Sequence, residues 1–312
     1  MGGVTVEDIY QCFPACNIML RPRGTLARTL YNKYLSDEHL ECLDKAEWYA
    51  IDKSKVPTLV ANSFVELGPD DETEEFLDNS RNLSNNVFLQ IFHALVKFFC
   101  SFFMTQTSIN GWLGRGSMFV LSKSQFATLS GRRQGQEGEL ADLGAGDGSI
   151  TAVLQNFFSS RVTVTEVSKA MKPQLLKKGF RMADVDTWHK RQYDMISCLN
   201  VLDRCDKPVS LLRQIRAALK PNAKAIIAIV LPFKPYVETG TKDNKPIEEL
   251  PITGKYFEDQ VTSVVEDVLE VEGFKVEAWT RLPYLCQGDL NQAYYWLHDA
   301  VFVVSLNQSH SQ

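Results

Sequence analysis

The stretch Ala141-Asp-Leu-Gly-Ala-Gly-Asp-Gly148 decides the fold. It follows a short apolar run at residues 139–143 and precedes a segment with helical periodicity at residues 149–158. A glycine loop that leaves a strand and enters a helix lets the backbone approach a ligand closely, and the helix N-terminus adds partial positive charge. The loop therefore predicts a ligand site at the carboxyl end of a strand.

Strands and helices alternate along the chain after this loop. Apolar or β-branched runs predict strands, and amphipathic spacing predicts helices. The strands are expected at residues 161–167, 193–199, 225–231, 275–281 and 299–305, and the helices at residues 208–219 and 257–272. This alternation predicts an α/β fold with a doubly wound, Rossmann-like sheet, which binds its ligand at the carboxyl ends of the strands.

The residues around the loop distinguish two classes of cofactor. The dinucleotide fingerprint requires a third glycine where this chain has Ser149. Asp142 and Asp147 would repel a pyrophosphate, whereas S-adenosylmethionine has no phosphate and carries a sulfonium and an ammonium group. Glu166 ends the next predicted strand, 22 positions after Gly144, where a carboxylate can accept both ribose hydroxyls. The sequence therefore favours S-adenosylmethionine over NAD.

Polar residues after the next two strands complete the candidate site. Either Asp184 or Asp186 could face the adenine amino group; the sequence does not decide between them, and we include Asp186 in the candidate cofactor site. Asn200 and Asp203 follow the strand at 193–199, over the expected position of the transferable methyl. Asn200 could hold the cofactor through its amide or its backbone. Asp203 could act as a general base or orient the acceptor, or it could cap the next helix or pair with its basic neighbour.

Composition argues against several other classes of protein. The chain has 33 Lys and Arg against 38 Asp and Glu, a net charge of −5, so no basic surplus points to nucleic acid. Seven cysteines without framework spacing, and five histidines that form no cluster with them, predict reduced thiols and no metal site. Cys205 has no histidine near it in sequence, so we interpret it as a small buried thiol.

One apolar stretch, residues 87–104, approaches the length of a membrane span. Gln90, His93 and Lys97 interrupt it, which predicts a buried or interfacial helix with one solvent-facing polar stripe and no transmembrane span. The first residues lack the features of a secretory signal, so an intracellular, cytoplasmic location is the default expectation.

Six blocks of the sequence, within residues 85–305, resemble the DREV-type methyltransferases, the family of protein-histidine N-pros (Nδ1) methyltransferases. Only the glycine-loop block is widespread among methyltransferases. The blocks are Thr107-Ser-Ile-Asn-Gly-Trp-Leu-Gly-Arg-Gly-Ser-Met-Phe119, Asp142-Leu-Gly-Ala-Gly-Asp-Gly148, Ile196-Ser-Cys-Leu-Asn-Val-Leu-Asp-Arg-Cys-Asp206, Val230-Leu-Pro-Phe-Lys-Pro-Tyr-Val-Glu238, Thr280-Arg-Leu-Pro-Tyr-Leu-Cys-Gln-Gly-Asp289 and Tyr294-Tyr-x-Leu-x-Asp-Ala-Val-Phe302.

The resemblance implies a seven-strand class I S-adenosylmethionine-dependent methyltransferase fold with an N-terminal helical cap. It implies protein substrates with His-x-His sequences in which x is small, and it leaves association with the endoplasmic reticulum or mitochondria open. It makes Asp203 and Tyr295 the catalytic candidates, with Asp203 holding the acceptor imidazole and Tyr284 and Tyr295 near the peptide groove. The residues it implies for the methyl donor are Asp142, Gly144, Gly146, Glu166 and Asn200, with Arg115 reaching the methionine carboxylate.

We expect three segments: a helical extension at 1–80, a helical cap at 81–135 and the methyltransferase domain at 136–312. The polar, glycine-rich run at 130–139 marks the second junction. Two alternatives stay open. The same fold could methylate another protein group or a small molecule, or it could retain the cofactor as a scaffold without turnover.

Overall fold

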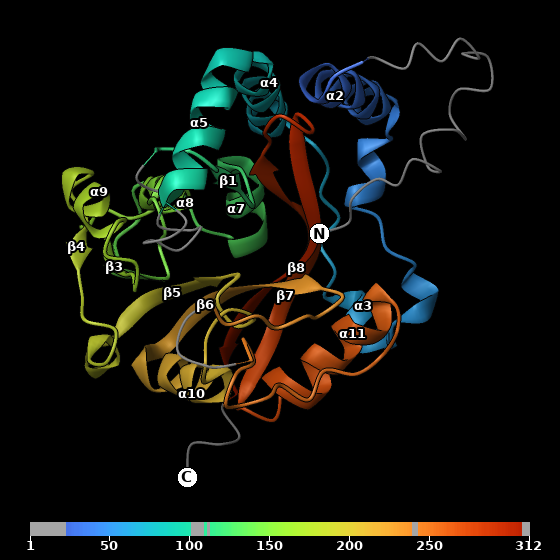
Figure 1. Cartoon of the computed structure of the whole chain (residues 1–312). Coiled ribbons are helices and arrows are strands. Elements are labelled where there is room, and N and C mark those ends of the chain that lie inside the picture. Colours follow the sequence, from blue (N-terminus) through green and yellow to red (C-terminus); the bar gives the residue numbers. More distant parts are fainter. Residues whose placement is uncertain (1–22, 101–108, 111–112, 239–242, 308–312) are drawn as a thin grey trace.

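One mixed sheet forms the centre of the computed structural model, which describes residues 23–100, 109–110, 113–238 and 243–307 (Figure 1). Its eight strands lie in the order β1-β7-β8-β6-β5-β2-β3-β4. They are β1 (Met118–Phe119), β2 (Leu140–Leu143), β3 (Thr163–Thr165), β4 (Arg181–Met182), β5 (Tyr193–Leu199), β6 (Leu219–Leu231), β7 (Phe274–Gln287) and β8 (Tyr294–Leu306). Strands β2 to β6 pair with one another in parallel, and β8 lies antiparallel between β6 and β7. The predicted doubly wound class I fold is confirmed, with β1 as an additional edge strand.

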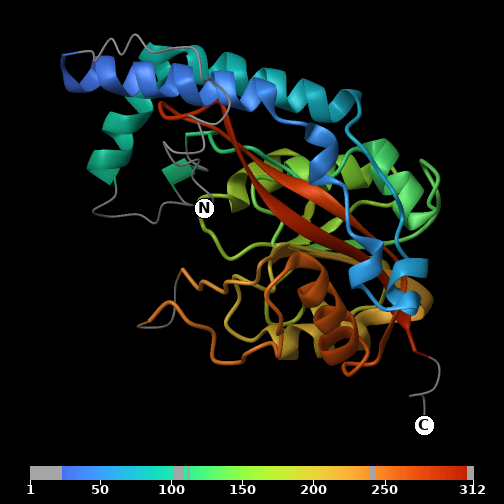
Figure 2. The same ribbon diagram turned by 90° about the vertical axis from the view of Figure 1, so that its right-hand side faces the viewer.

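Helices cover both faces of this sheet (Figures 1 and 2). Those before the glycine loop are α2 (Thr25–Cys42), η1 (Lys45–Trp48), η2 (Lys53–Lys55), α3 (Thr58–Asn62), α4 (Asp71–Asn85), α5 (Val87–Cys100) and α7 (Lys123–Ser130). Those after it are α8 (Ser149–Gln155), α9 (Lys172–Lys177), η3 (Trp188–Lys190), α10 (Pro208–Ala218), α11 (Phe257–Ser263) and the π-helix η4 (Val264–Leu269).

Strand β6 shows why its apolar run folds as a central strand. Ile227 and Ile229 belong to the hydrophobic core that includes α10, α11 and η4, whereas Ile226 and Ala228 belong to the core that includes α7, α8 and α9. Alternate side chains of a strand point to opposite faces, so an uninterrupted apolar run suits burial on both sides. Each fully buried isoleucine contributes about 1.5–3 kcal/mol of transfer free energy.

The hairpin of β7 and β8 is longer than its sequence pattern predicts. Its extension is covered by residues from the N-terminal region: the ring of Trp48 stacks on Trp296 at 5.6 Å and meets Tyr294 edge-on at 6.2 Å. Strand β1 pairs with β7 along the same extension. The sequence pattern predicts a strand only as far as residue 281. The rest of β7 is stabilised by partners from distant parts of the chain, which a local pattern does not reveal.

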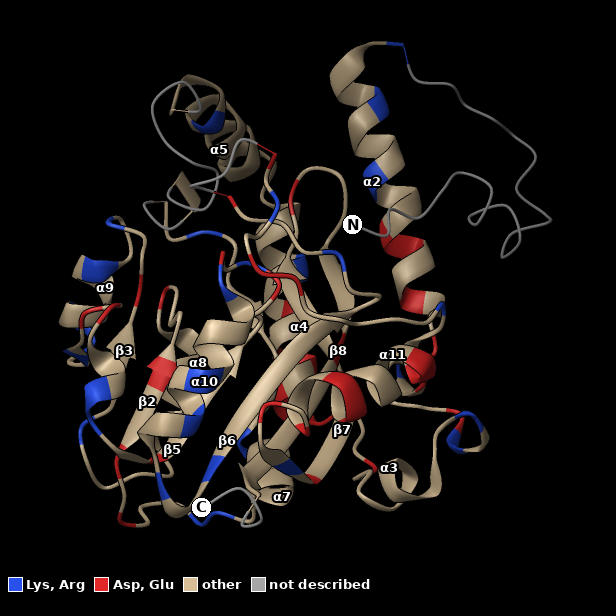
Figure 3. Ribbon diagram, turned by 90° about the horizontal axis from the view of Figure 1, so that it is seen from below, with Lys and Arg blue, Asp and Glu red and all other residues tan. Residues whose placement is uncertain are grey.

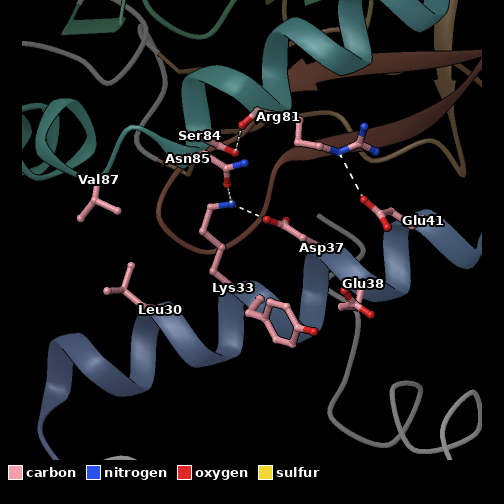
Figure 4. Close-up of a pocket in the computed structure, with 10 residues that line it drawn as sticks. Leu30, Lys33, Asp37, Glu38, Glu41, Arg81, Ser84, Asn85 and Val87 are labelled. Carbon is pink, nitrogen blue, oxygen red and sulfur yellow. Dashed lines mark hydrogen bonds and ion pairs between the residues drawn. The ribbon is translucent and has the colours of Figure 1, made fainter.

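Helices α2 and α4 run side by side above the hairpin (Figure 2). A pocket of about 300 Å³ lies between them (Figure 4). Inside it, Lys33 pairs with Asp37 and donates to Asn85 Oδ1 at 2.9 Å, while Arg81 lies 3.8 Å from Glu41. Basic residues occupy the first half of α2 and acidic residues the second half (Figure 3). The contacts of Lys33 with Asn85 and of Arg81 with Glu41 join α2 to α4 across the pocket.

Helix α5 differs from its predicted orientation. Gln90 and His93 are buried, whereas Phe88 is 86% exposed and Phe92 is 56% exposed. The expected solvent-facing polar stripe is therefore wrong: Gln90 Nε2 donates to the Leu83 carbonyl at 2.9 Å, and the apolar side faces outward. Among the described ranges, no helix combines the length and the apolar character needed to cross a bilayer.

The division of the chain at residues 80 and 135 stays a proposal. Both hydrophobic cores combine residues from the two sides of these boundaries. Val60 belongs to the same core as Ile227, and Leu77 belongs to the same core as Ile226.

Candidate active site

The glycine loop between β2 and α8 lines a small pocket at the carboxyl edge of the sheet. Gly144 and Gly146 have positive φ angles of 69° and 57°, in the left-handed region that glycine adopts without strain. A Cβ atom on Gly144 would lie 2.7 Å from Val201 Cγ2, so a larger residue does not fit there. The described lining comprises Met118, Val120, Gly144, Ala145, Gly146, Asp147, Ile150, Leu199, Asn200 and Tyr284.

Glu166 braces this loop from the end of β3. Its Oε2 accepts from the Gly146 amide at 2.8 Å, and its Oε1 accepts from the Ser168 amide at 2.7 Å. A carboxylate oxygen has two lone pairs, so each oxygen can still accept one ribose hydroxyl. The structure thus places Glu166 beside the loop, and its contact with a ribose stays a prediction.

Asp142 lies beneath the loop at the end of β2 and is almost completely buried. Its two oxygens accept from the hydroxyl of Ser197 at 2.5 Å and from the hydroxyl of Thr151. Burial raises the pKa of Asp142 to about 6, and the charge of Glu166 adds to the effect. The observed role of Asp142 is to tie β2, α8 and β5 together under the loop.

The adenine candidates lie after β4, away from these residues. Asp186 is exposed, and its amide donates to Asp184 Oδ1 at 2.8 Å in a tight turn. Neither side chain is in the described lining of the pocket, so the choice between the two stays open. Trp188, which follows the turn, is 2% exposed and belongs to the core.

Asn200 turns sharply at the end of β5, with a φ of 56°. Its backbone amide donates to the Ala228 carbonyl at 3.0 Å, which leaves its side chain and carbonyl as the groups available to a ligand. The side-chain Nδ2 donates to Asp299 Oδ2 at 2.7 Å. The side-chain Oδ1 is buried and has no partner among the described residues.

Asp203 is 3% exposed and lies three residues further on. Its Oδ2 is 3.1 Å from Arg204 Nε, so the predicted ion pair with the basic neighbour is present. Helix α10 begins at Pro208 with Lys207 as its cap residue, so the alternative of a helix cap is wrong. Asp203 Oδ1 is buried without a hydrogen-bond partner in the described part of the chain. Burial raises the pKa of Asp203, and Arg204 opposes the rise.

The remaining predicted residues divide between two places. Tyr284 lines the pocket, with its hydroxyl against Met118. Tyr295 and Arg115 instead meet at Asp289: the Tyr295 hydroxyl donates to Asp289 Oδ1 at 3.0 Å, and Arg115 Nη2 lies 3.9 Å from Asp289 Oδ2. Arg115 and Tyr295 therefore form a second polar group at the end of the β7–β8 hairpin.

Cys205, the cysteine considered as a possible nucleophile, lacks the features of one. Burial raises the pKa of Cys205 to about 12, with a further rise caused by Asp203. Cys205 is half-buried, so the expected buried thiol is only partly confirmed, but a raised pKa does not suit a nucleophile, which needs a lowered one.

Two acidic residues of the site, Asp299 and Asp289, were not among the predicted site residues. Asp299 is completely buried on β8 beside the apolar run 300–304, and burial raises its pKa well above the usual value. The sequence could have indicated Asp299, because a single carboxylate beside an apolar strand segment is costly to bury and therefore often functional. Asp289 carried a weaker signal, since it lies in a polar turn.

Comparison with known proteins identifies the chain. The model of the DREV methyltransferase family matches residues 48–306. The chain belongs to the DREV methyltransferase family. It is therefore a methyltransferase that depends on S-adenosylmethionine as its methyl donor.

Solved structures of methyltransferases are similar to this DREV methyltransferase in fold. A 1,6-didemethyltoxoflavin-N1-methyltransferase from Burkholderia thailandensis is 15% identical, with a TM-score of 0.39 over 78% of this chain and 94% of that one. A TehB-like S-adenosylmethionine-dependent methyltransferase from Corynebacterium glutamicum is 17% identical, with a TM-score of 0.36 over 57% and 83%. A ribosomal protein L11 methylase from Lactobacillus delbrueckii subsp. bulgaricus is 13% identical, with a TM-score of 0.33 over 55% and 72%.

The residues of the DREV methyltransferase pocket fit a cationic methyl donor. Three buried oxygens lack donors within the described ranges: one belongs to Asn200, which lines the pocket, and the others to Asp203 and Asp299, which lie outside its described lining. Leaving a buried acceptor unsatisfied costs about 1–3 kcal/mol, so a ligand that carries N–H groups or positive charge would be favoured here. Together with Glu166 beside the loop, these acceptors comprise three carboxyl groups and one amide oxygen, which suits a sulfonium and an ammonium group.

Replacing Glu166 tests the support of the loop. We expect Glu166→Ala to weaken S-adenosylhomocysteine binding by roughly 1–3 kcal/mol, because two backbone amides and the ribose lose their acceptor. Isothermal titration calorimetry measures the loss, and Glu166→Gln, which keeps one acceptor oxygen, should fall in between. Wild-type affinity in Glu166→Ala would move the ribose contact elsewhere.

The raised pKa of Asp142 predicts a pH dependence of stability. Between pH 4 and 6 the folded state holds a proton that the unfolded state has released, so the stability contributed by this group falls as the pH rises. A shift from 3.8 to about 6 corresponds to about 3 kcal/mol. Denaturant unfolding at pH 4.5 and 7 should therefore show Asp142→Asn gaining on the wild type at the higher pH. Parallel loss of stability in both proteins would contradict this.

Proposed function

We propose that this DREV methyltransferase transfers a methyl group to the δ nitrogen of histidine in His-x-His sequences of proteins, where x is a small residue. The observation that carries the proposal is the carboxyl group of Asp203. It is buried, it interacts electrostatically with the pocket-lining Tyr284, and its Oδ1 has no partner in the described structure. A methyl-accepting group that carries one N–H, such as a neutral imidazole, can donate a hydrogen bond to this oxygen.

The chemistry requires mainly positioning. A neutral imidazole, with an unperturbed pKa of about 6.5, is already a nucleophile near pH 7. The bound S-adenosylmethionine supplies an electrophilic methyl group on its sulfonium. By accepting from the ε N–H, Asp203 would select the tautomer whose δ nitrogen has the free lone pair. The same carboxylate would stabilise the positive charge that develops on the ring during transfer.

The carboxyl groups of Asp203 and Asp299 together suit a cationic product. The charge of Asp203 contributes to the raised pKa of Asp299, so ionising Asp299 costs more free energy beside it. A methylimidazolium beside them would lower that cost. The charge balance of the site therefore favours the methylated ring over the neutral one during the reaction.

Tyr295 is the proposed contact for the second histidine of the motif. Its hydroxyl donates to Asp289, and its oxygen has two lone pairs, so beside its hydrogen bond with Asn291 it could accept from an imidazole N–H. Burial, together with Asp289, raises the pKa of Tyr295, so the hydroxyl stays protonated. Arg115 would hold Asp289 in place from the other side.

Transfer of a labelled methyl group to peptides tests the proposal. We expect incorporation into a His-Ala-His peptide and sharply lower incorporation when the motif is replaced by lysines, arginines or one solitary histidine. Activity on the His-Ala-His peptide should fall below about pH 6.5, because a protonated imidazole has no lone pair to give. Equal transfer to the lysine peptide would support another protein acceptor, and transfer to none of the peptides would leave the small-molecule and scaffold alternatives.

A further inference from the structure

Asp299 is a buried carboxyl group that needs an explanation. It lies in the middle of the sheet, opposite Val230 of β6 and Leu282 of β7, and is completely buried. Within the described part of the chain, only one of its oxygens has a hydrogen-bond partner, Asn200 Nδ2 at 2.7 Å. Burying a carboxyl group with one oxygen unsatisfied costs free energy, a cost that an apolar residue at this position would not incur. A contribution to the stability of the fold therefore does not explain Asp299.

Its effect on Asn200 supplies the explanation. An amide side chain has a donating end and an accepting end, and the acceptor Asp299 draws the donating end toward the sheet. The positive φ of Asn200 and the bond from its backbone amide to Ala228 fix the main chain. The Oδ1 atom of this pocket-lining residue is then the polar side-chain atom left for a ligand.

We infer that Asp299 is a positioning residue that fixes the amide of Asn200 so that the site presents an acceptor, and thereby selects a ligand group with an N–H donor. Two groups have this chemistry: the ammonium of the methionine portion of the methyl donor and the N–H of the acceptor imidazole. The second rests on the proposed function. The first is independent of it.

Asp299→Leu tests this inference. The variant leaves the Asn200 amide free to turn, so we expect about tenfold or greater loss in the affinity or turnover of the ligand that contacts Oδ1. Its melting temperature should equal or exceed that of the wild type, because a buried ionisable group has been removed. Thr280→Val is the matched control. Thr280 lies on the neighbouring strand β7 and is also a completely buried polar residue, so its replacement should leave binding and turnover unchanged.

Separate readouts distinguish the two ligand groups. A raised Kd for S-adenosylhomocysteine, with an unchanged Kd for methylthioadenosine, which lacks the amino-acid portion, assigns Oδ1 to the ammonium. A raised KM or lowered kcat for the His-Ala-His peptide at unchanged Kd assigns it to the imidazole. The binding arm needs no acceptor, so it stays informative when the peptide is not methylated.

A polarity-exchanged pair covers the case in which Asp299→Leu fails to fold. Asn200→Asp combined with Asp299→Asn restores the hydrogen bond in the reverse direction and still presents an oxygen to the pocket. We expect it to recover the function that Asn200→Asp alone loses by placing two carboxyls in contact. The inference is overturned if Asp299→Leu matches the wild type in every readout, or if the pair is no better than Asn200→Asp.

Discussion

Asp203→Asn is expected to lower kcat on a His-Ala-His peptide by about 100-fold or more, with S-adenosylhomocysteine affinity and melting temperature near wild type. The amide oxygen can still accept from the ε N–H, but it lacks the charge that stabilises the methylimidazolium. The retained shape keeps the buried site filled, so the loss would be one of chemistry.

Arg204→Gln is the control for Asp203→Asn. It removes the 3.1 Å ion pair while leaving the carboxylate in place, and the Arg204 side chain is half exposed. Because the positive charge of Arg204 lowers the pKa of Asp203, this variant should lower kcat, but by less than Asp203→Asn, which removes the carboxylate itself. An Asp203→Asn enzyme with wild-type turnover would remove Asp203 from the mechanism and make Tyr295 the next residue to test.

Gly144→Arg is expected to abolish S-adenosylhomocysteine binding, and Gly144→Ala to weaken it strongly. The φ of 69° disfavours any side chain, and the first added carbon already lies 2.7 Å from Val201 Cγ2. Because Val201 adjoins Asn200, relief of this contact would move the end of β5 that lines the pocket. Calorimetry on the folded variants measures the loss.

Gly135→Ala separates backbone strain from damage to the pocket. Gly135 has a φ of 67°, close to that of Gly144, but an added Cβ there has no neighbour within 4 Å among the described atoms. This variant should lose some stability and keep its affinity. Unchanged binding in a folded Gly144→Arg protein would show that the loop is not the donor site.

The central part of the fold follows from local patterns in the sequence. The predicted strand at 193–199 coincides with β5, and the predicted strand at 225–231 forms the carboxyl-terminal half of β6, which begins at Leu219. The prediction failed where partners are distant: the extension of β7 depends on Trp48 and on β1, and α5 buries its polar residues against α4. Periodicity identifies an amphipathic face but not what that face contacts.

In the candidate site, too, local sequence predicted some residues, and contacts between distant parts of the chain determine the others. Gly144, Glu166 and Asn200 were predicted together because parallel strands end at one edge of a sheet, and the structure brings them to that edge. The pairing of Asn200 with Asp299 joins residues 99 positions apart through an antiparallel strand. No local spacing encodes that register. The predicted donor contacts of Asp142 and Arg115 stay predictions, since both side chains have protein partners outside the described pocket lining.

The position of the transferred methyl group on the histidine ring tests the account most directly. After reaction of the wild-type enzyme with a His-Ala-His peptide, acid hydrolysis and chromatography against authentic standards separate δ-methylhistidine from ε-methylhistidine. The account predicts δ-methylhistidine, because Asp203 holds the ε N–H and leaves the δ nitrogen to attack. Predominant ε-methylhistidine, or methyl transfer to a residue other than histidine, would contradict it.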